Sequence, residues 1–376
     1  AAWCFGGHGG QWPGMGRALA RWSPVAAGVF AELDGLLPGG VTGPLARPPG
    51  GGDEGPDVVQ PLIFAVQVAT ARWLLSLGLR PAAVVGHSLG EVAAAHVAGV
   101  LTLPEAARVV AVRSRLLARA ARGGAMATVG LDRHTVAQRC AATPGTVVVA
   151  AHSAPRETVV TGAADAVGAL VGALEAEGVR CRTIRIDAAS HSPFVDGVLP
   201  ELRAALAGLA PAAPRVPWVS TVDAGPEPPG AGTGTSSDTG TKSDAGTTSD
   251  PGTASGTETT SDSGTADYWA RNLRRPVRFT QAVSALAARG VRAFVEVGPH
   301  PVLARPLRDT LRAEGVAAPL VAASGHRGTP EPVALPRLLG ALYCRGLDVP
   351  GLPAPLAAHG AAPQESPSAA PEERQP

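Results

Sequence analysis

The sequence predicts an α/β protein, with a hydrolase-like parallel sheet in a large subdomain and a ferredoxin-like small subdomain inserted into it. Short apolar runs alternate with helical patterns in the first third of the chain, which is typical of a parallel sheet. Over residues 125–190 the order changes to strand, helix, strand, strand, helix, strand, as in a ferredoxin-like unit. After residue 190, helices and strands alternate again, as they do in the first third of the chain.

The first part of the large subdomain is expected over residues 1–124. A glycine-rich turn separates its first strand from its first helix, and a second tight turn joins a buried strand to another helix. The expected elements are a strand at 1–5, a helix at 15–37, a helix at 60–77, a strand at 82–85 and a helix at 104–121.

The small subdomain is expected over residues 125–190, and the second part of the large subdomain over 191–348. The small subdomain should contain strands at 126–129, 146–151, 158–161 and 181–187 and helices at 134–140 and 164–177. The second part of the large subdomain should contain helices at 193–209 and 280–289 and strands at 216–222 and 293–297.

Two segments lack the apolar residues that a core requires. Residues 224–266 consist almost entirely of glycine, threonine, serine, aspartate and proline, and residues 349–376 are rich in proline and alanine. Neither can bury enough apolar surface to offset the entropy of ordering. We expect a disordered surface insertion at the first and a linker to a further domain at the second.

Composition argues against several function classes. The net charge is +1 with scattered basic residues, so nucleic acid is not an expected partner. The four cysteines lack the spacing of a metal site or disulfide framework, and we expect no bound metal and a cytoplasmic location. No apolar run reaches membrane-spanning length, and the chain begins without methionine, as expected for a piece of a longer protein.

The strongest chemical motif is the GxSxG sequence at 86–90. It follows an apolar run and precedes an alanine-rich helix, which is the setting of a nucleophile elbow. The elbow exposes the hydroxyl of Ser88, and the amide of Leu89 would lie at a helix N-terminus, where an oxyanion forms. We therefore predict that Ser88 is the nucleophile of an acyl-transfer reaction.

A serine nucleophile needs a base, and a carboxylated substrate needs a cation. His191 lies where the chain leaves the small subdomain, so the crossover could return it to the cleft as the general base. His87 is held in the elbow as a neighbour of the serine, and His300 lies in a proline-flanked turn. Arg113 could bind a carboxylate through its planar fork if it faces the cleft.

With these residues in view, the chain resembles the malonyl-CoA:acyl-carrier-protein transacylase family, and within it the acyltransferase domains of polyketide synthases. The resemblance covers residues 3–345. Seven motifs carry it in order: GHGGQWPGMG at 7–16, DVVQP at 57–61, GHSLGE at 86–91, RSR at 113–115, ASHSP at 189–193, YWARNL at 268–273 and EVGPHP at 296–301.

The resemblance implies a role for each matching residue. Ser88 would be acylated and His191 would be its base, with Arg113 gripping the substrate carboxylate. Asn272 would orient the histidine through a carbonyl oxygen. The remaining assignments are the amides of His8 and Leu89 as the oxyanion hole, and Gln60, Ser190 and His87 as substrate-pocket residues.

The resemblance also suggests the substrate. A serine before the base histidine, here Ser190, tolerates a branched acyl group, which favours methylmalonyl over malonyl. Ala188 replaces the usual tyrosine and widens the pocket, so malonyl or a bulkier group stays open. Two further departures are His8 in place of glutamine, which leaves the backbone amide unchanged, and Ser153 in place of asparagine.

The implied activity is transfer of an acyl group from coenzyme A to the phosphopantetheine thiol of an acyl carrier protein, without a permanently bound cofactor. Expected partners are the carrier protein, the CoA thioester, and a ketosynthase and other synthase domains in the same polypeptide; no membrane is expected. Two alternatives stay open. One is a serine thioesterase or other α/β-hydrolase, with His300 and Asp267 completing the triad, and the other is a non-catalytic docking module.

Overall fold

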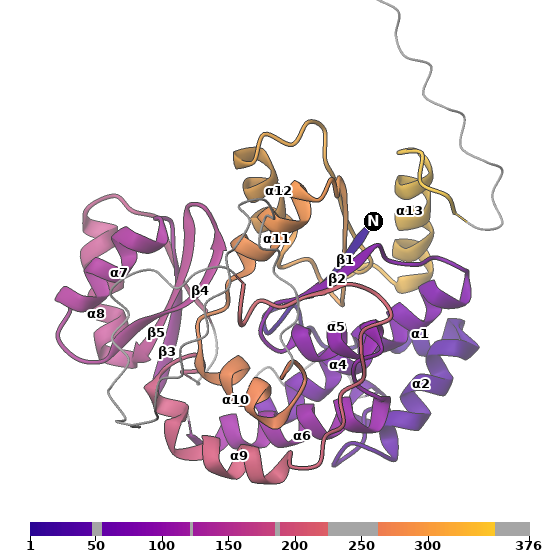
Figure 1. The fold of residues 1–376 in the computed structure, drawn as a ribbon, viewed down its shortest axis with the longest axis horizontal. Coiled ribbons are helices and arrows are strands. Elements are labelled where there is room, and N and C mark those ends of the chain that lie inside the picture. Colours follow the sequence, from indigo (N-terminus) through magenta and orange to yellow (C-terminus); the bar gives the residue numbers. More distant parts are fainter. Residues whose placement is uncertain (47–54, 121–122, 185–188, 225–261, 350–376) are drawn as a thin grey trace, which may run out of the picture.

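The computed structural model describes residues 1–46, 55–120, 123–184, 189–224 and 262–349. Figure 1 shows a larger unit with a central sheet next to a smaller unit built on a second sheet. The five-stranded sheet has the order β7-β2-β1-β8-β9, and the four-stranded sheet has the order β4-β5-β3-β6. The predicted fold class, a parallel-sheet unit with an inserted ferredoxin-like unit, is confirmed.

The large sheet is entirely parallel and forms from short apolar segments. Its strands are β1 (Ala2–Phe5), β2 (Ala83–Gly86), β7 (Trp218–Val219), β8 (Ala293–Val297) and β9 (Leu320–Ala323). Phe5 is in register with Gly86 on one side and Val297 on the other. The loops that follow these three strands therefore leave the sheet at the same edge, where ligands of parallel sheets bind.

Alternate residues of β1 face two different helical layers. Trp3 and Phe5 pack with α2 (Pro24–Asp34), α4 (Pro56–Ser76), α5 (Gly90–Ala98) and α6 (Leu103–Ala120). Ala2 and Cys4 pack with α11 (Phe279–Ala288) and α12 (Ala304–Ala313). α4 is long and apolar enough to cross a membrane, but 83% of its most apolar stretch is buried inside the protein, so it serves as a core helix.

The small sheet follows the predicted order of elements. Its strands β3 (Gly124–Val129), β4 (Val147–Ala154), β5 (Glu157–Ala163) and β6 (Cys181–Ile184) pair in antiparallel fashion. Helices α7 (Arg133–Ala142) and α8 (Ala164–Ala176) share a separate core with one face of this sheet. The expected strand at 181–187 reaches residues 185–188, which lie outside the described residues.

Two helices expected to be continuous are interrupted. The helix at 15–37 is α1 (Arg17–Trp22) followed by α2, because Ser23 caps α2 by accepting the amide of Ala26 and Pro24 occupies its first position. The helix at 193–209 is a 3₁₀ helix, η1 (Pro193–Val198), followed by α9 (Leu199–Ala205).

Other boundaries also differ from the expected ones. The helix expected from residue 60 begins at Pro56, which supplies a proline at the first position, and the strand at 216–222 shortens to the two residues of β7. The short α3 (Thr42–Ala46) lies in the first part of the chain, and α10 (Ala266–Arg274) and α13 (Glu331–Tyr343) lie in the second. Most of the expected insertion at 224–266 and of the expected linker at 349–376 falls at 225–261 and 350–376, outside the described residues.

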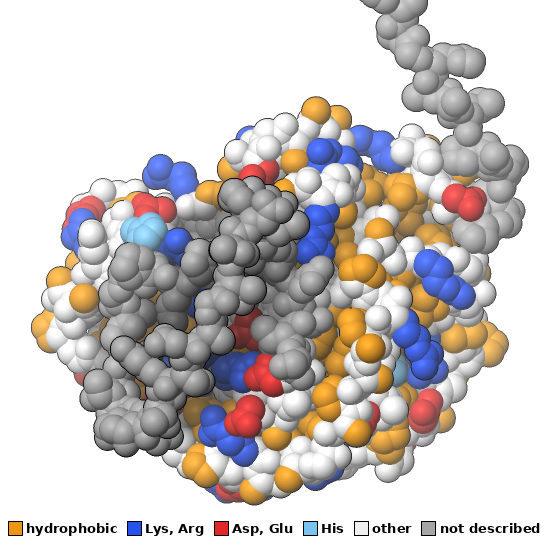
Figure 2. Space-filling model, viewed as in Figure 1, with side chains coloured by type: hydrophobic (Ala, Val, Ile, Leu, Met, Phe, Trp, Pro, Cys, Tyr) orange, Lys and Arg blue, Asp and Glu red, His pale blue; other side chains and the backbone are white. Residues whose placement is uncertain are grey.

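The face of the molecule drawn in Figure 2 has no single electrostatic character. Arginine side chains are scattered over it among acidic and apolar ones. This scatter agrees with a formal net charge of +1 for the whole chain. Charge at individual sites therefore has to be judged from local contacts.

Candidate active site

Ser88 occupies a sharp turn between β2 and α5. Its φ of 55° lies in the left-handed region, which residues other than glycine rarely adopt. The flanking residues must be glycine, because a Cβ on Gly86 would lie 2.2 Å from the Cα of Glu91. A Cβ on Gly90 would lie 2.1 Å from the carbonyl oxygen of Phe5. The GxSxG sequence thus lets the start of α5 lie directly against β1 and β2.

His191 lies beside this serine although 103 residues separate them in the sequence. Its Nε2 is 2.7 Å from Ser88 Oγ, and its Nδ1 is 2.8 Å from the backbone carbonyl oxygen of Arg275. Because a carbonyl only accepts, Nδ1 carries the ring proton and Nε2 accepts from the serine hydroxyl. Burial, followed by the charge of Arg113, lowers the pKa of His191 to about 3, so the imidazole is neutral near pH 7.

The group that orients this histidine is not the one expected. Among the described residues, Asn272 makes no hydrogen bond to His191; its side chain contacts Arg113 and the backbone of Ser88. The carbonyl that holds the imidazole belongs to Arg275, three residues further along the chain. The correction has a simple physical reason: a main-chain oxygen serves this purpose whatever side chain stands there.

Arg113, on α6, is buried, with 1% of its surface exposed. Its Nη2 donates to Ser88 Oγ at 2.9 Å, its Nη1 to Gln60 Oε1 at 2.7 Å and its Nε to Asn272 Oδ1 at 3.3 Å. All three acceptors are neutral, and within the described ranges no carboxylate forms an ion pair with Arg113. Burial lowers its pKa to about 10, which still leaves the guanidinium cationic near pH 7.

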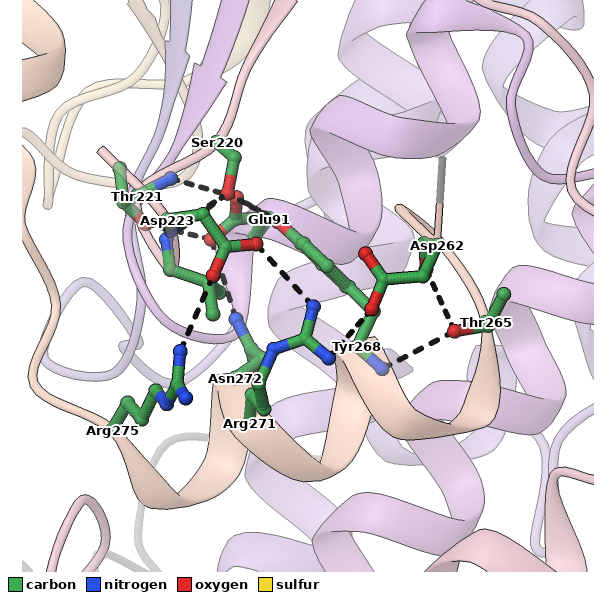
Figure 3. Close-up of polar contacts among 11 residues, drawn as sticks. Glu91, Ser220, Thr221, Asp223, Asp262, Thr265, Tyr268, Arg271, Asn272 and Arg275 are labelled. Carbon is green, nitrogen blue, oxygen red and sulfur yellow. Dashed lines mark hydrogen bonds and ion pairs between the residues drawn. The ribbon is translucent and has the colours of Figure 1, made fainter. Parts of the chain in front are cut away.

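A carboxylate that was not predicted as a site residue lies behind this arginine. Glu91, in the first turn of α5, is fully buried and accepts hydrogen bonds from Thr221, Tyr268 and Asn272. Figure 3 shows how these donors come from α10 and from the segment after β7. Burial raises the pKa of Glu91 to about 7. Its signals in the sequence were its place at the end of the GHSLGE motif and its position as the acid of an alanine-rich helix.

The two amides assigned to the oxyanion hole have no acceptor. Leu89 precedes the first residue of α5, and His8 lies in the glycine-rich loop after β1. Neither backbone N–H donates a hydrogen bond in the part of the chain that the structure describes. Gly7 brings this loop against the elbow, since a Cβ there would lie 2.8 Å from the carbonyl oxygen of His87 and 3.5 Å from the Cβ of Ser88.

The side chain of His8 has a fixed tautomer. Gln11 Oε1 accepts from the amide of Gly9 at 2.7 Å, so the Nε2 of Gln11 is the atom that donates to His8 Nε2 at 3.0 Å. The ring proton is therefore on Nδ1, which is buried and has no partner among the described residues. Burial and the charge of Arg113 lower the pKa of His8 to about 4, so the ring stays neutral.

The remaining predicted pocket residues lie around the same centre. Ser190 is buried, and its hydroxyl is 3.8 Å from the sulfur of Met126. His87 packs against Phe279 edge to face, with ring centroids 5.7 Å apart, and burial lowers its pKa to about 4. Ser153 is buried in β4, and Ala188 lies outside the described residues.

The triad of the hydrolase alternative is not assembled. The side chain of Asp267 is 67% exposed and pairs with Arg203 at 2.6 Å. The Nδ1 of His300 accepts from the backbone amide of Arg327 at 3.2 Å. Neither group contacts Ser88.

Comparison with known proteins agrees with this geometry. The acyl transferase domain family matches residues 2–349. The chain is 40% identical over 350 residues to the 5-methyl-1-naphthoate synthase of Streptomyces sahachiroi. That alignment covers 93% of this chain but only 18% of the relative, so the chain spans a small part of the length of the curated proteins it matches.

Solved structures give the same answer. The acyltransferase domain from the second module of the salinomycin polyketide synthase superposes with a TM-score of 0.78 at 34% identity, covering 93% of this chain and 74% of that one. An acyl carrier protein S-malonyltransferase from Vibrio cholerae O1 biovar eltor has a TM-score of 0.69 at 28% identity, covering 86% of this chain and 96% of that one. The chain therefore belongs to the acyl transferase domain family, and it is similar to the acyltransferase domains of polyketide synthases.

Proposed function

We propose that this domain moves a carboxylated acyl group from coenzyme A, through an ester on Ser88, to the phosphopantetheine thiol of an acyl carrier protein. One observation carries the proposal: a buried guanidinium that forms no direct ion pair among the described residues lies 2.9 Å from the candidate nucleophile. A buried cation that forms no direct ion pair is costly, even with the charge of Glu91 behind it, so it is retained where an anion binds during function. The free carboxylate of a malonyl-type group is such an anion.

In the first half of the reaction, the hydroxyl of Ser88 attacks the thioester carbonyl while Nε2 of His191 takes its proton. The amides of His8 and Leu89 donate to the oxygen of the tetrahedral intermediate. The carbon–sulfur bond then breaks, and the imidazolium returns its proton to the leaving thiolate of coenzyme A. Arg113 holds the carboxylate of the acyl group meanwhile.

The second half runs the same steps with a different thiol. The phosphopantetheine thiol of the carrier protein gives its proton to His191 and attacks the serine ester, and Ser88 leaves with the proton restored. The Vibrio cholerae relative is by its name an acyl carrier protein S-malonyltransferase, which supports a carrier thiol as the acceptor here. No permanently bound cofactor is needed.

For the acyl group we favour methylmalonyl, with malonyl as the alternative. Ser190 is buried next to the base histidine, and its small side chain leaves room for a methyl branch on the α-carbon. A larger side chain at this position would occupy that room. We further propose that the domain works in the cytoplasm beside a ketosynthase and other synthase domains of the same polypeptide.

Arg113→Ala tests the carboxylate-binding role. We expect acylation of Ser88 by malonyl-CoA to fall about 100-fold, since a buried charged pair is lost, while acylation by acetyl-CoA is retained or increased. Intact-protein mass spectrometry over time measures both. Arg115→Ala is the matched control, because Arg115 is on the same helix with a 58% exposed side chain paired with Glu201.

The same experiment separates the alternatives. Equal loss for both CoA esters would refute the carboxylate role of Arg113. Appearance of free acid at the rate of ester loss, with no acyl group on an added carrier protein, would indicate a hydrolase. Absence of any mass on Ser88 in the unaltered domain would contradict the acyl-serine intermediate itself.

A further inference from the structure

Both carboxyl oxygens of Glu91 lie within hydrogen-bond distance of polar groups from α10 and from the segment after β7. Oε1 accepts from the amide of Thr221 at 2.9 Å and from the hydroxyl of Tyr268 at 2.5 Å. Oε2 accepts from the hydroxyl of Thr221 at 2.6 Å and from Nδ2 of Asn272 at 3.3 Å. These contacts are drawn in Figure 3. The Nδ2 group of Asn272 can only donate, so Glu91 Oε2 is the acceptor in this contact.

The contact with Asn272 determines which way that amide faces. An asparagine side chain donates from one end and accepts at the other. Nδ2 faces two acceptors, Glu91 Oε2 at 3.3 Å and the carbonyl oxygen of Ser88 at 3.2 Å. The acceptor end, Oδ1, is therefore left facing Nε of Arg113 at 3.3 Å.

The orientation of Asn272 in turn fixes the guanidinium. With Nε held by Asn272 and Nη1 held by Gln60, the plane of the Arg113 fork is defined by two contacts from different helices, α10 and α4. Its Nη2 is then directed at Ser88 Oγ. Reversing the amide of Asn272 would place two donors against each other at Nε and remove one of these two contacts.

We propose that Glu91 is a positioning residue for recognition of the substrate carboxylate: by accepting from Asn272, it keeps Oδ1 of that amide facing Arg113. This inference rests on the proposed function, because it assumes that Arg113 binds the acyl carboxylate. The side chain of Glu91 makes no hydrogen bond to Ser88 Oγ or to the fork of Arg113, and among the described residues Asn272 is the hydrogen-bonded link between Glu91 and Arg113.

A role based only on charge predicts the opposite effect. The negative charge of Glu91 lies behind Arg113 and repels an anion that approaches the fork. If charge alone mattered, removing it would tighten the binding of malonyl-CoA and lower KM. If positioning dominates, removing it disorders the fork and raises KM. The direction of the change therefore decides between the two.

Glu91→Gln makes this comparison with almost no change of shape. The amide of Thr221 can only donate, so the oxygen of the new glutamine must face it. The new NH₂ group then faces the Thr221 hydroxyl, which can accept, and Asn272, which can accept from it only by turning and giving up its contact with the Ser88 carbonyl. That turn places Nδ2 of Asn272 against Nε of Arg113.

We expect the KM for malonyl-CoA in single-turnover acylation to rise about tenfold in Glu91→Gln, the usual effect of losing one hydrogen bond to a charged group. The KM for acetyl-CoA should change less than twofold, because acetyl-CoA makes no use of Arg113. Any loss of the contact to the Ser88 carbonyl lowers the rate with both esters equally and leaves their ratio unchanged.

Two control variants exclude general damage. Tyr268→Phe removes a hydrogen bond from the same carboxylate without changing what Asn272 faces, so the preference between the two esters should stay the same. Glu331→Gln neutralises another buried carboxylate, which accepts from the amide of Gly16 and contacts neither Arg113 nor Asn272. It too should leave the preference unchanged.

The double variant Glu91→Gln/Asn272→Asp exchanges the two groups and keeps the net charge. An aspartate at 272 accepts both from the glutamine and from Nε of Arg113 but cannot donate to the carbonyl oxygen of Ser88. The rate with both esters should therefore fall, while the preference for malonyl-CoA should recover at least threefold. This variant also serves if Glu91→Gln alone fails to fold, as judged by circular dichroism. A lowered or unchanged KM for malonyl-CoA in Glu91→Gln, or a double variant without the preference, would overturn the positioning role.

Failure of the proposed function and failure of the inference about Glu91 would give different results. Failure of the unaltered domain to acylate Ser88 with malonyl-CoA would count against the proposed function. Normal acylation and a normal effect of Arg113→Ala, with no effect of Glu91→Gln, would count against the inference about Glu91 alone.

Discussion

At the scale of single residues, the lowered pKa of His191 determines whether its imidazole can accept the proton of Ser88. The imidazole donates a hydrogen bond to a main-chain oxygen and accepts one from the serine hydroxyl, and no acidic side chain contacts it among the described residues. A hydrolase triad places an aspartate at this point, which favours the protonated ring. Here burial and Arg113 favour the neutral ring, which is the form that can accept a proton.

This leads to a prediction about pH. At saturating malonyl-CoA, the rate of Ser88 acylation should stay constant from pH 8 to pH 6, because the pKa of His191 lies at about 3. A histidine with an ordinary pKa of about 6.5 would lose about fourfold over this range. Rapid-quench acylation at constant ionic strength measures it. A fourfold decline that follows a single ionisation near pH 6.5 would contradict the lowered pKa.

Residue motifs predicted some partners of this site and missed others. Ser88, His191, Arg113 and Gln60 lie in contact as their motifs suggested. The orienting carbonyl could not be predicted from residue type, because every residue has one. Glu91 ends the GHSLGE motif, but the motif does not indicate its role, because its partners come from segments more than a hundred residues away.

At the scale of elements, predictability followed the strength of the apolar pattern. β1, β2 and β8 are short buried runs and were predicted within a residue or two. β9 was not predicted, because it is a half-buried edge strand of four residues whose pattern is weak. α12 was also missed: arginine and aspartate occupy its exposed face, and its apolar contacts depend on just a few side chains such as Leu307 and Leu311.

The break between α1 and α2 shows how local chemistry overrides a continuous pattern. Apolar residues continue across residues 15–37, yet the serine and proline at 23 and 24 provide a cap and a first position for a new helix. The capping hydrogen bond from the amide of Ala26 to Ser23 starts a new helix at Pro24, although the apolar pattern continues. Periodicity alone does not contain this information.

The ends of the segment 225–261 are held together by one side chain. Arg271 of α10 bonds to Asp223 at 3.4 Å and to Asp262 at 2.7 Å, as Figure 3 shows. Asp223 also pairs with Arg275, whose carbonyl holds the base histidine. The contacts near the site therefore come from the residues that flank this segment.

We predict that residues 225–261 can be replaced by a glycine-serine linker of about eight residues, which spans the short gap between the two ends. Acylation of Ser88 by malonyl-CoA should stay within twofold and the melting temperature within about 3 °C. Mass spectrometry and calorimetry measure these quantities. A loss of acylation beyond tenfold in a folded protein would show that the segment itself contributes to the site.

At the scale of the whole molecule, the small sheet is joined to the large unit next to the residues that hold the base. Val277 donates to the carbonyl of Ala150 at 2.9 Å and accepts from the amide of His152 at 2.8 Å, which joins β4 to the strand-like segment after α10. Arg275 lies two residues before Val277. The docking of the small unit and the placement of His191 therefore share one short stretch of chain.

The buried titratable groups predict how stability depends on pH. Burial lowers the pKa of five imidazoles to about 3 or 4, so each stabilises the fold above its unfolded pKa of about 6.5 and loses this effect as the pH falls. These histidines are His8, His87, His96, His152 and His191. Burial raises the pKa of Glu91 and Glu296 to about 7, which acts in the opposite direction.

Five groups outweigh two, so the free energy of unfolding should be lower at pH 5 than at pH 7 by at least about 2 kcal/mol. Urea unfolding followed by tryptophan fluorescence at both values measures the difference. The variant Glu296→Gln should make the difference larger, since it removes one of the two opposing groups. Greater stability at pH 5 in the unaltered protein would contradict the buried neutral histidines.

Ser88 and His191 share a further property: both have a left-handed backbone, with φ of 55° and 59°. Glycine adopts this conformation without steric penalty, whereas other residues lose roughly 1–2 kcal/mol in it. An engineering procedure that ranked substitutions by backbone fit would therefore recommend glycine at both positions. Thermostability and chemistry thus compete most directly at these two positions, and any stabilised version of the domain has to leave them untouched.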